Sequence, residues 1–237
     1  MRAVVDRHGR TRLVELRSCP PISLRDTPDG LYVVGSAAMP LGGDVLSLEL
    51  IVEEGAELVV RAAAAAIALR GDATASRFAV RAVVAAGGSL TWLPEPLVST
   101  AGSRHEADSR VVLGEGASLL WREEVVLGRS GEDPGAYRGR LRVDRGGAPL
   151  LRHELRLEGD WAVGPAVLDG AGAVGTLFAC GPSVIAGPTR SLGEAAALMT
   201  LAPDAVLAAV LAADAPGVRR ALDDAAAALA APSVAVA

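Results

Sequence analysis

Apolar and polar residues alternate with a period of two over most of this chain, and this alternation limits the fold more than any other feature. Between Val45 and Glu53 every second residue is leucine or valine, and the positions between them include serine and glutamate. Between Leu151 and Glu158, leucines and His153 alternate with arginines and glutamates. Such alternation is typical of a strand with one buried face. It holds to about residue 195, so the sequence predicts a mainly β protein.

Turns made of small residues recur along this region, each followed by an apolar strand. They lie at 54–58, 86–90, 115–119 and 145–150, a spacing of roughly 30 residues, which falls in the range of known structural repeats. A unit of two strands and one glycine turn cannot bury its apolar face alone, so several units must stack. The repeat predicts a helically wound, layered β-body. An ordinary antiparallel sandwich whose turns recur is the alternative.

The period changes near the end of the chain. In 203–211, a Pro-Asp pair precedes a stripe of valine and leucine, and 217–231 is a second Ala-rich segment that ends before Pro232. Both patterns are typical of amphipathic helices. We expect a β-rich body over 1–202 and C-terminal α-helices within 203–237, packed on that body as part of the same domain. The alternative is a helical arm that binds a partner.

Composition excludes several classes of function. The formal net charge is −5 and the pI is near 5.3, whereas nucleic-acid-binding proteins usually carry a basic stripe. All 23 basic residues are arginine, so a P-loop lysine or a Schiff base is excluded. The N-terminal residues are charged, and the longest apolar run, 195–213, is interrupted by polar residues and proline. We therefore expect no secretory signal, no membrane span and a cytoplasmic location.

Motifs for catalysis or metal binding are weak. The segment 170–175 matches the dinucleotide-binding glycine pattern, but 176–180 reads as a strand where that motif needs a helix. The three histidines and two cysteines are isolated, with no metal-ligand spacing, and we expect both thiols to be structural or incidental. The carboxylates are dispersed, as is typical of solvated strand faces. The sequence predicts no enzyme, no tightly bound cofactor and no recognisable metal site.

A series of short landmarks follows in order along the chain. They are Pro40-Leu41-Gly42-Gly43-Asp44, Gly55-Ala56-Glu57-Leu58, Trp92-Leu93-Pro94-Glu95-Pro96, Gly116-Ala117, Leu127-Gly128-Arg129-Ser130-Gly131-Glu132 and Arg145-Gly146-Gly147-Ala148-Pro149-Leu150. No single landmark is diagnostic, but from residue 30 to 160 their order and spacing resemble the UreD (UreH) family of urease accessory proteins.

The resemblance implies a non-enzymatic assembly factor with a wound, mostly β fold. Members of the family bind urease apoprotein and the companions UreF and UreG and help to deliver nickel to urease. GTP is hydrolysed by UreG, and an internal polar passage is thought to carry the metal. A carrier that passes nickel onward should hold it weakly and transiently, through oxygen ligands and water more than through thiolate or imidazole clusters. The scarcity of histidine and cysteine agrees with that expectation.

The resemblance also points to candidate residues for partner binding or metal passage, while one strand departs from the family pattern. The candidates are Asp44, Trp92, Glu95, Glu106, Arg129 and Glu132. For Asp44, capping of its own turn is the structural alternative, and for Arg129 and Glu132 it is an ion pair across a turn. The segment 61–69 is almost wholly apolar where the family commonly has threonine and glutamine, which argues against a metal-passing role for that strand.

A second class of function, a small hydrolase or carbohydrate-binding β-domain, remains as the alternative. A glycoside hydrolase would need two close carboxylates in one pocket. Glu123 and Glu124 are adjacent in sequence, but adjacent strand residues face opposite sides. We therefore do not expect them to form such a pair.

Overall fold

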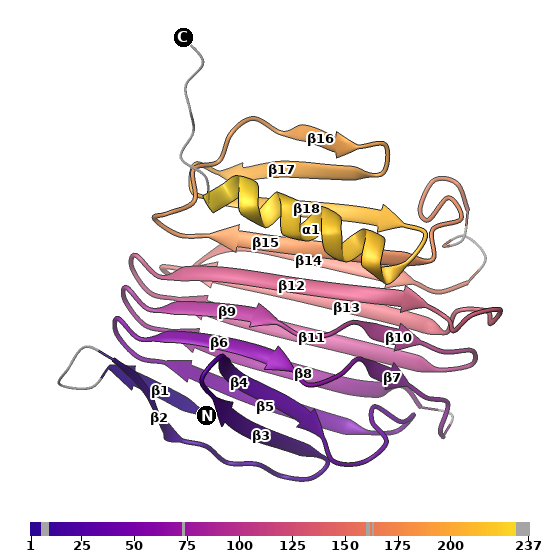
Figure 1. The fold of residues 1–237 in the computed structure, drawn as a ribbon, viewed down its shortest axis with the longest axis horizontal. Helices are drawn as coiled ribbons and strands as arrows, with labels where there is room; N and C mark the ends of the chain where they lie inside the picture. The colour runs from indigo at the N-terminus through magenta and orange to yellow at the C-terminus, as the bar shows by residue number, and fades with distance from the viewer. Residues whose placement is uncertain (6–9, 73, 160–161, 163, 231–237) are drawn as a thin grey trace.

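The computed structural model describes residues 1–5, 10–72, 74–159, 162 and 164–230. Among these residues the strands form two sheets that lie face to face, and one helix covers the outside of one sheet (Figure 1). This is the mainly β, wound and layered architecture predicted from the sequence.

Sheet A is seven-stranded and lies at the back of Figure 1, with the order β14-β13-β11-β8-β5-β1-β2. Its strands are β1 (Arg2–Val5), β2 (Thr11–Glu15), β5 (Val45–Val52), β8 (Ser76–Val84), β11 (Arg104–Leu113), β13 (Ala136–Arg145) and β14 (Ala148–Leu157).

Sheet B lies in front, with the order β16-β17-β18-β15-β12-β9-β6-β4-β3, and β10 and β7 extend it beside β12. Its strands are β3 (Ile22–Thr27), β4 (Gly30–Gly35), β6 (Glu57–Ala62), β7 (Ala66–Ala68), β9 (Ser89–Leu93), β10 (Leu97–Ser99), β12 (Ser118–Leu127), β15 (Ala173–Cys180), β16 (Arg190–Gly193), β17 (Ala196–Ala202) and β18 (Ala205–Ala212).

The central strands form parallel coils. The chain passes from β5 to β6, from β8 to β9 and from β11 to β12, and each step crosses from sheet A to sheet B through one of the predicted glycine turns. Strands β5, β8 and β11 pair in parallel, as do β6, β9 and β12. Successive turns are hydrogen bonded, since Gly55 N donates to Ala86 O at 3.1 Å and Gly87 N to Glu115 O at 2.9 Å. The repeat therefore builds a stack of coils with a continuous core.

The fourth glycine turn has a different role. Gly146 and Gly147 both have positive φ, 59° and 80°, and they form a two-residue connection between β13 and β14. Two consecutive residues with positive φ suit a type I′ hairpin, whose twist matches antiparallel neighbours. The chain therefore turns back within sheet A and ends the parallel series.

The prediction of a helix over 203–211, the first of the two expected near the C-terminus, is wrong. Residues 205–212 form β18, which lies between β15 and β17, and Pro203 and Asp204 make the turn from β17. Val206 packs beneath α1 on the outer face of sheet B, whereas Leu207 packs in the core between the two sheets. A strand buried on both faces reads as a continuous apolar run, which periodicity cannot distinguish from a buried helix.

The second predicted helix is confirmed as α1 (Ala215–Ala230), and the proposed end at Pro232 lies outside the described residues. Asp214 caps it, with Gly217 N donating to Asp214 Oδ1 at 2.8 Å. Val218 and Leu222 are fully buried against β15 and β18. The helix packs on the β-body, as expected (Figure 1).

The apparent dinucleotide motif belongs to this helix contact. Its residues lead directly into β15, so no helix follows the glycines. A Cβ at Gly175 would lie 2.3 Å from Val218 Cγ1 and 2.8 Å from Leu222 Cδ1. The last glycine of the pattern therefore allows α1 to approach the sheet closely. No helix among the described residues has the length and apolar character needed to cross a membrane.

Candidate functional site

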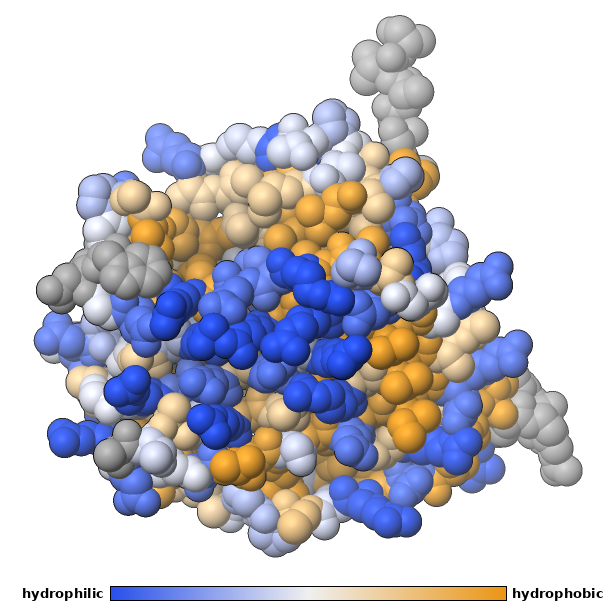
Figure 2. Space-filling view, turned by 180° about the vertical axis from the view of Figure 1, so that it is seen from behind, coloured by the Kyte–Doolittle hydropathy of each residue, from blue (hydrophilic) through white to orange (hydrophobic). Residues whose placement is uncertain are grey.

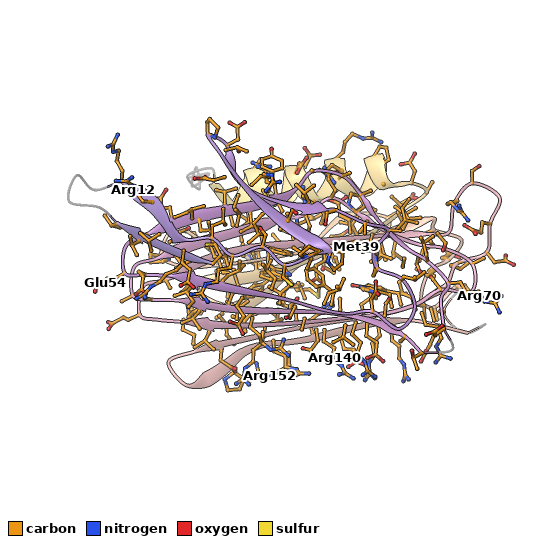
Figure 3. All side chains as sticks on the ribbon, turned by 90° about the horizontal axis from the view of Figure 1, so that it is seen from below. Arg12, Met39, Glu54, Arg70, Arg140 and Arg152 are labelled. Atoms are coloured by element: carbon orange, nitrogen blue, oxygen red, sulfur yellow. The ribbon has the colours of Figure 1, made fainter. Side chains whose placement is uncertain are left out.

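A cavity of about 400 Å³ opens beside the end of the coils where β6 leads into β7. Met39, labelled in Figure 3 near the space between the layers, lines the cavity together with the alanine-rich segment 62–66. Trp92 and Glu95 line it from sheet B, and the buried His105 lines it from sheet A. The apolar segment that departs from the family pattern thus forms the cavity wall.

Behind this cavity lies a group of polar side chains between the sheets, here called the interior polar cluster. Its members are Ser76, His105, Ser109, Glu123 and Tyr137. The Ser76 Oγ–His105 Nδ1 distance is 2.9 Å, and the rings of His105 and Tyr137 stack with centroids 6.2 Å apart. Ser109 lies close enough to Glu123 to lower the pKa of that carboxyl group. These residues come from β8, β11, β12 and β13, so the coil register is what brings them together.

Glu123 is the carboxylate of the interior polar cluster. Trp121 Nε1 donates to its Oε1 at 2.9 Å, and Trp121 itself stacks on Trp92 with ring centroids 4.9 Å apart. Glu123 lies on the same side of β12 as the buried Trp121, between the sheets, and is itself partly accessible. The tryptophan pair and its hydrogen bond hold the carboxylate in position.

Burial controls protonation in this cluster. Desolvation lowers the pKa of His105 to about 4, although the negative charge of Glu106 opposes the shift. Desolvation raises the pKa of Glu123, and the hydrogen bond from Trp121 and the nearby Ser109 offset part of that rise. Burial and then the charge of Glu123 raise the pKa of Tyr137 well above 10. At neutral pH His105 is therefore a neutral imidazole.

A second charged group joins α1 to sheet B from the outer side of β12. Arg219 Nε donates to Glu124 Oε1 at 2.7 Å and Arg219 Nη2 to Glu95 Oε2 at 3.1 Å. Arg122 Nε lies 2.9 Å from Glu124 Oε1, and its Nη1 donates to Asp223 Oδ1 at 2.8 Å. Desolvation raises the pKa of Glu124 and lowers that of Arg122. The side chains of Arg122 and Glu124 are only 7% and 2% exposed, so this network fixes the helix.

The structure does not bring the six predicted site residues together. Trp92 and Glu95 both line the cavity, although Trp92 also packs in the core and Glu95 also anchors α1. Glu106 lies on the outer face of sheet A, 3.1 Å from Arg77 Nε. The remaining three residues lie in exposed turns.

The three turn residues have the structural contacts that were considered as alternatives. Asp44 Oδ2 accepts a hydrogen bond from Leu41 N at 2.8 Å and so caps its own turn. Glu132 accepts from Arg129 N, Nε and Nη2 at 2.9–3.0 Å. These contacts give each of the three residues a role in its own turn.

Sequence reasoning missed the interior polar cluster, because none of its five members is among the six candidate residues. Polar residues at inward positions of strands were the available signal, because His105 and Ser109 are spaced four apart on the buried face of β11. The predicted separation of Glu123 and Glu124 is confirmed, since Glu123 bonds to Trp121 between the sheets and Glu124 to Arg219 beside α1. Neither thiol belongs to the cluster, and burial raises the pKa of Cys180 to about 12.

Within the described part of the chain, no group of three or more His, Cys, Asp or Glu side chains is arranged to hold a metal ion. The fold and the site define a wound β-protein with a cavity beside a buried polar interior.

Comparison with known sequences gives the family. A sequence model described as UreD urease accessory protein matches residues 2–236. A urease accessory protein UreD from Streptomyces avermitilis is 44% identical over 232 residues, which cover 93% of this chain and 92% of the relative. UreD 3 from Streptomyces griseus is 45% identical over 240 residues (95% and 93% covered), and UreD from Parafrankia sp. is 41% identical over 248 residues (92% and 84%). The chain belongs to the UreD family of urease accessory proteins, and membership implies a role in urease maturation.

Proposed function

We propose that this chain is a non-catalytic scaffold that binds urease apoprotein with UreF-type and UreG-type companions and helps to deliver nickel to urease in the cytoplasm. Family membership supports the scaffold role. The interior polar cluster is the observation that supports passage of nickel, because it is polar, lies between the sheets and adjoins an open cavity.

The chemistry of the cluster suits a weakly held metal. When the Ser76 hydroxyl donates to Arg104 O, 3.2 Å away, His105 Nδ1 donates to Ser76 Oγ and Nε2 keeps a free lone pair. Neutral imidazole and carboxylate are both ligands for first-row divalent metals. His105 and Glu123 supply one of each, which is too few to hold a metal tightly. Nickel is therefore cargo in this proposal, with no tightly bound cofactor.

The hydrolase or carbohydrate-binding alternative has less support. Of the described residues that line the cavity, Glu95 is the only carboxylate, and Arg219 pairs with it. A pair of catalytic acids would require a second carboxylate within about 5 to 9.5 Å in the same site. The two candidates next to each other in β12 face opposite sides of sheet B.

Copurification with activation tests the scaffold role. The tagged chain is expressed with the urease subunits and the UreF-type and UreG-type proteins, and the same strain without the chain is the control. We expect the tag to retain urease apoprotein and at least one companion, and urease activity to require the chain. Retention of none of these proteins, together with full urease activation in the control strain, would refute the proposal.

A further inference from the structure

Four arginines lie in register across the outer face of sheet A. Arg81, Arg110, Arg142 and Arg152 pair along β8, β11, β13 and β14. Adjacent strands are about 4.8 Å apart, so the row spans about 14 Å. Their side chains are 38–55% exposed. Like charges directly opposite one another in a sheet are unfavourable, so this row carries a local cost.

Too few carboxylates lie on this face to neutralise the arginines. Asp108 lies within 3.7 Å of both Arg81 and Arg142, and Asp144 is shared by Arg110 and Arg152. In the same way Glu154 is shared by Arg138 and Arg140. Glu49 adds a fourth carboxylate, since it lies in register with Arg81 on the exposed face of β5. Four carboxylates therefore face six arginines, and this group, here called the arginine face, keeps two positive charges. The whole chain has a net charge of −5, so the positive charge is concentrated here.

An apolar row runs beside the four arginines. It consists of Ile51, Val83 and Val112, which are in register on β5, β8 and β11. Val83 and Val112 follow Arg81 and Arg110 by two residues, so they lie on the same face of the sheet. They are 38%, 49% and 39% exposed. Figure 2, seen from behind, shows a hydrophilic patch across the middle of this side with a hydrophobic patch next to it. In Figure 3, Arg140 and Arg152 lie on the side opposite α1.

We propose that the arginine face and this apolar row together bind a carboxylate-rich surface of one partner protein in the urease maturation complex. Arginine suits bidentate pairing with carboxylates, and arginine beside apolar residues is typical of the energetically important part of protein interfaces. A nucleic acid fits less well, because a phosphate backbone offers no apolar surface to cover the exposed Ile51, Val83 and Val112. The inference rests on the proposed scaffold function.

Three variants and one control test this surface in the copurification experiment. The row variant R81Q/R110Q/R142Q/R152Q removes four positive charges, and R81K/R110K/R142K/R152K keeps them without the bidentate geometry. Val83→Glu leaves every arginine in place and adds an acid to the apolar row, so it tests the surface if the row variant fails to fold. The control R12Q/R17Q/R70Q/R190Q removes the same charge from exposed arginines outside the arginine face.

The proposal predicts which variants lose the partner. Retention of one component of the complex should fall at least about tenfold in the row variant and in Val83→Glu, and should weaken in the unaltered chain as salt is raised. The lysine variant should retain an intermediate amount, and the control should match the unaltered chain. Three results would overturn the proposed binding surface while leaving the scaffold function intact. They are unchanged retention by folded Val83→Glu and row variants, an equal loss in the control, and loss of the partner on nuclease treatment. Failure of the unaltered chain to retain any component would overturn the scaffold function itself.

Discussion

Replacement of Gly175 by alanine tests how closely α1 is packed on sheet B. The added Cβ would lie 2.3 Å from Val218 Cγ1, whereas ordinary contacts between carbon atoms are about 3.5 to 4 Å. The helix or Val218 must therefore move by more than about 1 Å. Overpacking of this kind typically costs about 1 to 3 kcal/mol, which lowers the Tm of a chain of this size by about 2 to 4 °C per kcal/mol.

A double-mutant cycle isolates the contact. Val218→Ala removes the clashing methyl group, so the combination G175A/V218A should be more stable than the sum of the two single changes predicts, by about 1 to 2 kcal/mol. Gly187→Ala is the matched control, because its Cβ would meet only Arg190 Nη1, at 3.5 Å. Urea denaturation followed by tryptophan fluorescence measures all four variants. If Gly175→Ala is as stable as Gly187→Ala, or if the cycle shows no coupling, the close packing of α1 is wrong.

Two further predictions concern the buried polar groups. The pKa of His105 falls from 6.5 in the unfolded chain to about 4 in the folded chain, so the folded state binds fewer protons as the pH is lowered. The free energy of unfolding should therefore drop by roughly 2 to 3 kcal/mol from pH 7 to pH 4.5. In urea titrations His105→Gln should lose that part of the pH dependence, and a variant with the same pH profile as the unaltered chain would contradict this prediction. Arg122→Gln leaves Glu124 in a buried site with one fewer cation and should cost about 3 to 5 kcal/mol by the same titrations, whereas Arg17→Gln, at a side chain 86% exposed, should change stability by less than about 1 kcal/mol.

The β-body could be predicted from the sequence because each local pattern agreed with the fold. The alternation in 45–52 places leucine and valine inward, and the glycines at the coil turns have the positive φ that such turns require. The strand β18 could not be predicted, because a strand buried on both faces loses its alternation. The hairpin at Gly146 and Gly147 was also missed, since the same residue types make a coil turn at Gly87 and Gly88.

The functional surfaces depend on the register between strands, which one sequence does not contain. His105 and Glu123 are near in sequence, yet their relation to Ser76 and Tyr137 appears only when β8, β11, β12 and β13 are stacked. The four in-register arginines likewise come from four different strands, and only the pairing of these strands places them in one row. Of the predicted site residues, Trp92 and Glu95 line the cavity, since Trp92 lies near the end of β9 and Glu95 lies in the short break between β9 and β10, within one of the sequence landmarks.

The nickel content of urease matured with a Glu123→Gln variant tests the central proposal most directly. Glutamine keeps an acceptor for Trp121 Nε1 and the side-chain volume, but it replaces the ionisable carboxyl group between the sheets with an amide that cannot ionise. Glu115→Gln, at an exposed coil turn, is the matched control. With equal recovery of the complex on the tagged chain, we predict that urease from the Glu123→Gln strain contains several-fold less nickel per active site than urease from the Glu115→Gln strain. Equal nickel content in the two preparations would contradict passage of the metal through the interior polar cluster.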